Sequence, residues 1–145
     1  MAMDGRWSQL DYEMLLELAE RRGLRVLERA LPDLLTGLYS ESHRLILVES
    51  RILEEQQRVA LAHELIHAER HDASCAAAPF SKIELATRRE VAIRLVNPEA
   101  YRIAEETGGY AYQIACDLGV TVQCVRDYQR YLEECAENIG RRISA

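Results

Sequence analysis

The stretch Leu61-Ala62-His63-Glu64-Leu65-Ile66-His67-Ala68-Glu69 decides what this chain can be. The apolar residues around it repeat with a helical period, and in a helix two residues four apart lie on one face, about one turn from each other. The imidazoles of His63 and His67 can therefore bind one zinc ion. Glu64 can act as general base, because zinc lowers the pKa of a bound water towards ~7. The pattern predicts a metal-dependent hydrolase.

A catalytic zinc ion usually has three protein ligands and a water, so the two histidines need a third partner. His71 repeats the four-residue spacing. In a continuous helix, however, it lies ~12 Å from His63 along the axis, too far to share an ion held at ~2.1 Å. We therefore expect the third ligand on the next helix.

Two acids on that helix, Glu84 and Glu90, have suitable chemistry, and the Ala73–Pro79 loop allows their helix to pack beside the first. Glu84 lies in line with Val91 on the predicted buried face, where a carboxylate is costly unless a charge such as zinc compensates it. Glu90 shares its side with Arg94, which favours a solvated position. We expect Glu84 to be the ligand and keep Glu90 as the alternative. Without a metal, Glu84 would interact with the helix dipole.

The first part of the chain has the pattern of one helix followed by a small sheet. Apolar spacing predicts a helix over Trp7–Arg22, with Ser8 as N-cap and Gly23 as the C′ residue. Three short runs then favour strands, and we expect a three-stranded antiparallel sheet with a hairpin turn at residues 41–43. These runs are Leu24–Ala30, Gly37–Ser40 and Arg44–Val48.

The rest of the chain is helical, which gives an α+β class. Most of the predicted helices begin after a capping residue or end at a glycine. In the second of them, Ile83, Val91, Ala92 and Leu95 are expected to form the inner face. The predicted spans are Leu53 to about Asp72, Lys82–Val96 after the cap Ser81, Pro98 to about Glu106 after Asn97, Tyr110–Leu118 before Gly119, and Val122 to about Ile139 after Thr121.

Length and composition are those of one globular domain, 1–145, with a core over about 8–97 and a helical portion over about 98–140. A net charge of −6 and a pI of about 5.3 give no field that would attract nucleic acid or an anionic membrane. No apolar run reaches the ~20 residues of a membrane span, and residues 1–8 lack a secretory signal, so we expect a cytoplasmic protein. The cysteines are then expected to be free thiols: Cys75, Cys116, Cys124 and Cys135.

These residues resemble the ImmA/IrrE family of metallopeptidases. The resemblance is carried by residues 61–69, by Lys82-Ile83-Glu84 and by Ala92-Ile93-Arg94-Leu95-Val96. It covers Leu24–Val96 and extends more weakly to Leu132.

The resemblance implies a minimal zincin-like fold and assigns roles to four residues: His63, His67 and Glu84 as zinc ligands, and Glu64 as general base. Two positions depart from the family pattern. Thr87 replaces a usual alanine, and Glu90 replaces a common aromatic residue. These departures keep Glu90 as the alternative ligand.

Family members occur in phages and other mobile elements, and several cleave a helix-turn-helix repressor encoded nearby. The leading hypothesis is therefore a zinc-dependent endopeptidase that cuts a specific protein partner, such as a transcriptional repressor. The Arg44–Val48 strand would bind the substrate as an added strand.

Two other functions are considered. One is a regulatory protein-binding module with a structural or vestigial zinc site. The other, less favoured, is DNA binding through Asp117–Tyr131, where the predicted recognition helix carries a single base, Arg126, in an acidic chain. Spacing does not select an oxyanion-stabilising residue among the tyrosines: Tyr101, Tyr110, Tyr112, Tyr128 and Tyr131.

Overall fold

A computed structural model describes residues 6–72, 78 and 80–144. Within these residues the fold has six helices and a three-stranded sheet, which confirms the α+β class. Cys75 and most of the expected Ala73–Pro79 loop lie outside the described residues. The elements are α1 (Tyr12–Arg21), β1 (Arg25–Arg29), β2 (Gly37–Ser40), β3 (Leu45–Glu49), α2 (Glu54–Glu69), α3 (Lys82–Leu95), α4 (Pro98–Thr107), α5 (Ala111–Leu118) and α6 (Val122–Ser144).

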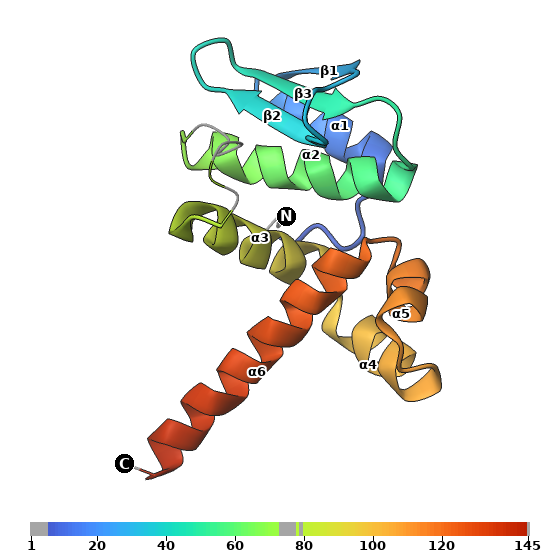
Figure 1. The fold of residues 1–145 in the computed structure, drawn as a ribbon, viewed down its shortest axis with the longest axis vertical. Helices are drawn as coiled ribbons and strands as arrows, with labels where there is room; N and C mark the ends of the chain where they lie inside the picture. The colour runs from blue at the N-terminus through green and yellow to red at the C-terminus, as the bar shows by residue number, and fades with distance from the viewer. Residues whose placement is uncertain (1–5, 73–77, 79, 145) are drawn as a thin grey trace.

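The elements are stacked in layers around α2 (Figure 1). The sheet covers one side of α2, and α3 packs on the opposite side. Helix α1 packs against both α2 and β1. The first part of α6 contacts α3 and α5, and its C-terminal half projects away from the body. Helix α2 is therefore the centre of the molecule.

Burial along α2 reflects this central position. Apolar side chains such as Leu61, Leu65 and Ile66 are fully buried, and they meet Ile46 and Val48 of the sheet within one core cluster. Polar side chains of α2 are buried too, because neighbouring elements cover more than one of its faces. These polar residues are Gln57, Arg58, Glu64 and His67.

The sheet differs from the predicted antiparallel arrangement. Its order is β1-β3-β2, with β2 antiparallel to β3 but β1 parallel to it. Only β2 and β3 are joined by a tight turn, as predicted. The longer segment 30–36 carries the chain across the sheet, so the apolar strand β3 takes the central position. Substrate addition to the Arg44–Val48 strand is thus wrong, because both edges of β3 are already paired.

The chain enters α1 later than predicted. The N-cap is Asp11, whose carboxylate accepts a hydrogen bond of 2.9 Å from the Met14 amide, and Ser8 is not a cap. The preceding residues form a turn because the carbonyls of Trp7, Ser8 and Leu10 accept hydrogen bonds from Arg58 of α2. These carbonyls accept hydrogen bonds from a buried side chain, so the helix begins only after them.

The caps of the later helices are confirmed. Ser81, Asn97 and Thr121 each accept a hydrogen bond from the amide three residues on, and Gly119 ends α5 with a left-handed φ of 65°. One predicted inner residue of α3 is wrong: Ile83 is 48% exposed. It lies about 80° around the helix from Val91. Thr87 and Glu84 occupy the buried face instead.

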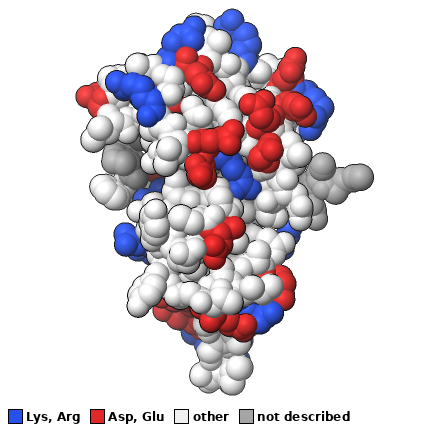
Figure 2. All heavy atoms as spheres, turned by 90° about the vertical axis from the view of Figure 1, so that its right-hand side faces the viewer, with Lys and Arg blue, Asp and Glu red and all other residues white. Residues whose placement is uncertain are grey.

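The surface mixes charges of both signs. Figure 2 shows acidic and basic side chains interspersed on the face that carries α4 and α5, without a continuous basic area on that side. No helix in the described parts of the chain is long and apolar enough to cross a membrane.

Glu49 at the end of β3 fixes the segment between β1 and β2. Its buried carboxylate accepts hydrogen bonds from the Leu31 amide at 3.0 Å and from the Arg51 amide and guanidinium at 2.7–3.0 Å. The Arg51 side chain first, and then the Leu31 amide, lower the pKa of Glu49 from 4.5 to about 2. The charged form of Glu49 therefore stabilises the fold.

This lowered pKa predicts an acid-sensitive contribution to stability. The contribution of Glu49 is complete above pH 4.5 and is lost as the pH falls towards 2, because the unfolded chain then binds the proton first. Denaturant unfolding of Glu49→Gln should show a loss of stability at pH 6 that shrinks towards pH 2. Glu20→Gln, at an exposed position in α1, should show no such trend. If the difference in unfolding free energy between wild type and Glu49→Gln stayed constant with pH, the stabilising role of the Glu49 carboxylate would be contradicted.

Candidate metal centre

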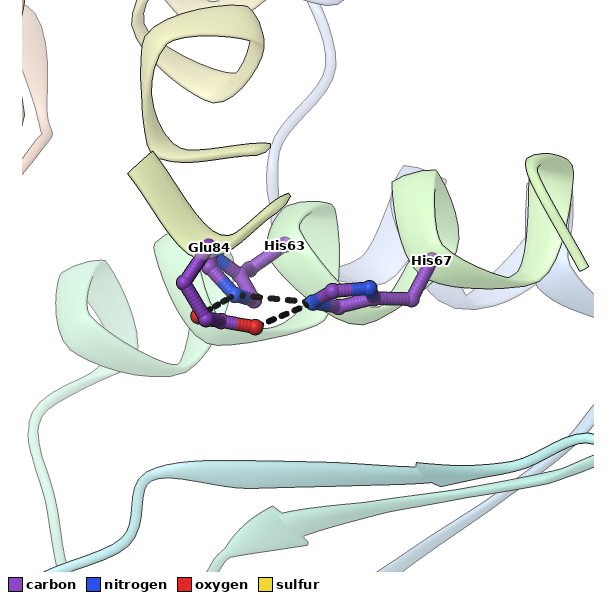
Figure 3. Close-up of side chains that lie close together, drawn as sticks. All are labelled: His63, His67 and Glu84. Atoms are coloured by element: carbon purple, nitrogen blue, oxygen red, sulfur yellow. Dashed lines mark hydrogen bonds and ion pairs between the residues drawn. The ribbon is translucent and has the colours of Figure 1, made fainter. Parts of the chain in front are cut away.

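Three side chains from two helices converge beside the C-terminal half of α2 (Figure 3). His63 and His67 lie one turn apart on α2, and Glu84 extends towards them from the first turn of α3. The two histidine Nε2 atoms are 3.2 Å apart. Glu84 Oε1 lies 2.7 Å from His67 Nε2, and Oε2 lies 2.9 Å from His63 Nε2. The structure thus brings together the three residues predicted as ligands.

The chemistry of this group suits a divalent metal such as zinc. Two imidazole nitrogens and one carboxylate are a common donor set for a catalytic zinc ion. Ligands held at ~2.1 Å in a tetrahedron are about 3.4 Å apart. The observed separations of 2.7–3.2 Å are slightly shorter, as hydrogen bonds between the same atoms require. A small outward movement would admit an ion, so the group could hold a metal.

His67 is oriented by a residue that sequence reasoning did not single out. Its ring is fully buried, and its Nδ1 lies 2.5 Å from a carboxylate oxygen of Asp72, just beyond the end of α2. A carboxylate at Nδ1 favours a proton there and leaves Nε2 as the coordinating nitrogen. An acid shortly after the second histidine was the available signal, but only the fold places it against the ring.

His63 is the more accessible of the two histidines, with 18% of its side chain exposed. Burial lowers its pKa, but the hydrogen bond with Glu84 and the negative charges of Glu64 and Glu84 raise it more. The net pKa of His63 lies above its ordinary value. The site therefore attracts positive charge, which a metal cation would supply.

The two rejected or alternative ligands lie elsewhere. Glu90 accepts a hydrogen bond of 2.8 Å from Arg94 Nε, four residues on. His71 is exposed, and its Nδ1 lies 3.0 Å from Glu41 of the hairpin turn. Neither side chain belongs to the converging group.

Glu64, the predicted base, is buried against the start of β2. A Cβ atom at Gly37 would lie 3.0 Å from both Cγ and Oε1 of Glu64. This separation is too short for comfortable packing, so the absence of a side chain at Gly37 makes room for the carboxylate. The sequence shows a glycine at the head of a strand, but not what approaches it.

A cleft opens beside His63, Glu64 and Glu84, with a volume of about 390 Å³. One wall is the segment 34–37, and the other is the cap Thr121 with the first part of α6, as far as Asp127. Its α2 side includes Gln56, Val59 and Ala60, and α3 contributes Arg88 and Val91. No tyrosine lines this cleft among the described residues.

Comparison with known families identifies one match. The family model Peptidase_M78, described as the IrrE N-terminal-like domain, matches residues 19–127. The matched range contains the three converging side chains, Glu64 and both walls of the cleft. Searches of curated proteins and of solved structures give no significant match.

Loss of a ligand should abolish tight metal binding. We expect wild type to bind one zinc ion per chain, and Glu84→Ala to weaken binding by more than the roughly 10–100-fold typical of an outer-shell partner. Glu90→Ala, on the same helix, should retain wild-type affinity. Titration against a chromophoric chelator measures all three. Equal losses in the two variants, or a loss only in Glu90→Ala, would reject this ligand set.

Asp72 should affect metal affinity without touching the ion. Asp72→Ala removes the partner of His67 Nδ1 and should weaken zinc binding by about 10–100-fold. Asp72→Asn keeps an acceptor but loses the charge, so the loss should be smaller. Glu41→Gln, which alters the neighbouring His71 contact, is the control and should bind zinc normally. Unchanged affinity in Asp72→Ala would contradict the orienting role.

Proposed function

The chain belongs to the ImmA/IrrE family of metallopeptidases, and on that premise we propose that it is a zinc-dependent endopeptidase acting on a specific protein. The observation that carries the proposal is the convergence of His63, His67 and Glu84 beside a cleft that His63, Glu84 and Glu64 line. A group that could hold a metal beside a cleft is the arrangement that metal-assisted peptide hydrolysis uses. The whole of 1–145 would act as one zinc-peptidase unit.

The proposed mechanism assigns a separate role to each side chain. His63, His67 and Glu84 would hold the metal, which when bound would supply Lewis acidity to the scissile carbonyl and the attacking water. Glu64 takes a proton from that water as the water oxygen bonds to the carbonyl carbon. Glu64 then returns the proton to the amine as the C–N bond breaks. Gly37 leaves the Glu64 carboxylate room to occupy its position.

The substrate would bind in an extended form along β2. Within the described residues β2 pairs with β3 only, so its other edge is available for an added strand. Gly37 at its start touches Glu64, and segment 34–37 forms a wall of the cleft. The edge of β2 thus replaces the Arg44–Val48 strand as the proposed binding edge.

The proposed partner is a helix-turn-helix transcriptional repressor in the cytoplasm. Family resemblance supports this choice. A cleft of about 390 Å³ is also consistent with a local segment of a protein partner being the substrate. The mixed charges in Figure 2 favour a protein partner over direct DNA binding on that face.

Replacing the base tests catalysis separately from metal binding. Glu64→Gln should retain zinc, because Glu64 is not a ligand, but should slow cleavage by about 10²–10⁴-fold, the usual contribution of a general base. Mass spectrometry of a neighbouring-gene repressor incubated with the zinc-loaded chain measures cleavage. The control Glu55→Gln changes an exposed acid in the first turn of α2 and should cleave normally.

Two results would reject the peptidase proposal. One is cleavage by Glu64→Gln at the wild-type rate. The other is a wild-type chain that binds zinc and retains the repressor in a stable complex without cutting it. The second result would instead identify a regulatory binding module.

A further inference from the structure

Arg88 occupies a position in the cleft that peptidase chemistry can use. It lies four residues after Glu84, which places it about one turn further along the same face of α3. It lines the cleft together with His63 and Glu64, and it is the only lysine or arginine among the described residues that do so. Its side chain is 26% exposed, so it can still meet a bound molecule.

The guanidinium is held in place by α6. Arg88 Nε and Nη2 donate to Oδ2 and Oδ1 of Asp127 at 3.1 and 2.7 Å. Asp127 is largely buried and also accepts a hydrogen bond of 3.0 Å from Gln123. Two parallel hydrogen bonds fix the plane of the guanidinium. Nη1 takes no part in this pair, and within the described part of the chain its N–H groups have no hydrogen-bond acceptor.

Arg88 and the converging group face the same space. Its side chain lines one cleft with His63, Glu64 and Glu84, so a molecule bound there would meet the guanidinium and the candidate metal ligands together. A fixed cation beside a reacting carbonyl stabilises the negative charge that develops on its oxygen. No tyrosine in the described part of the chain lines the cleft, and Arg88 is the one cationic side chain that does.

We propose that Arg88, positioned by Asp127, donates a hydrogen bond from its guanidinium to the substrate carbonyl oxygen as that oxygen becomes negative. The proposal rests on the peptidase function proposed above. Water oxygen bonds to the carbonyl carbon, the π-electron pair moves to the carbonyl oxygen, and the water proton passes to Glu64. When the C–N bond breaks, the pair returns and Glu64 protonates the amine. Arg88 gives up no proton in either step.

Two probes separate this role from metal binding. N-phosphoryl-leucyl-tryptophan carries a tetrahedral anionic group that mimics the addition step, whereas acetohydroxamate binds the metal without one. In the zinc-loaded chain, Arg88→Gln should weaken binding of the phosphoryl peptide by about a hundredfold, as loss of one oxyanion donor does. Acetohydroxamate binding should be unchanged. Calorimetry measures both.

A neighbouring arginine gives a matched control. Arg89 carries the same charge on the same helix, but it pairs with Glu134 at 3.3 Å, lies over the Tyr131 ring and does not line the cleft. Arg89→Gln should bind the phosphoryl peptide like wild type.

Asp127→Asn distinguishes positioning from a purely structural clamp between α3 and α6. It leaves the guanidinium present but less well held, so its loss of phosphoryl-peptide affinity should be smaller than that of Arg88→Gln. Thermal unfolding checks that both variants fold. If Arg88→Gln or Asp127→Asn is unstable, Arg88→Lys replaces it in the test. Because lysine keeps the positive charge, Arg88→Lys should bind the phosphoryl peptide more tightly than Arg88→Gln does. If the Arg88–Asp127 pair only held α3 and α6 together, Arg88→Gln and Asp127→Asn should lose equal affinity for the phosphoryl peptide.

Three results would overturn the proposal while zinc binding remains intact. They are equal phosphoryl-peptide affinity in Arg88→Gln and Arg89→Gln, equal losses for both probes, and a wild-type chain that does not bind the phosphoryl peptide. A chain that takes up no zinc would reject the peptidase function itself, and the metal titration would show this first.

Discussion

Helix α2 is covered on several sides, so every buried polar group on it needs a partner inside the protein. An unpaired buried group costs about 1–3 kcal/mol, and none of the buried side-chain nitrogens or oxygens in the described residues lacks a partner. Gln57 donates to the Glu49 carbonyl, and His67 meets Asp72 and Glu84. The same requirement that stabilises the central helix therefore also fixes the geometry of the group formed by His63, His67 and Glu84.

Arg58 shows this constraint most fully. Its guanidinium donates to the carbonyls of Trp7, Ser8, Leu10, Leu118 and Gly119. Burial lowers the pKa of Arg58. The carbonyl oxygens of Leu118 and Gly119, at the negative end of α5, favour its charged form. By holding the α5–α6 turn, Arg58 positions the first part of α6. Asp127, and through it Arg88, depends on that placement.

Local features were predictable from sequence, and long-range ones were not. The caps Ser81 and Asn97 and the pairing of His63 with His67 follow from spacing within one helix. Glu84 was chosen correctly for the buried face, although Ile83 was misplaced beside it. The parallel alignment of β1 depends on how the chain crosses the sheet. Ser8 is not the N-cap of α1, because its carbonyl accepts a hydrogen bond from the distant Arg58 guanidinium. Asp72, Gly37 and Arg88 became part of the site only through packing between elements.

The order of the site along the chain has a consequence for synthesis. The three converging side chains lie between residues 63 and 84, whereas the second wall of the cleft begins at Thr121. A chain that emerges N-terminus first therefore carries all three converging side chains before it has both walls of the cleft. For the proposed peptidase, this order would separate uptake of a metal from recognition of a protein in time. A nascent chain would be able to bind an ion while still unable to position a peptide.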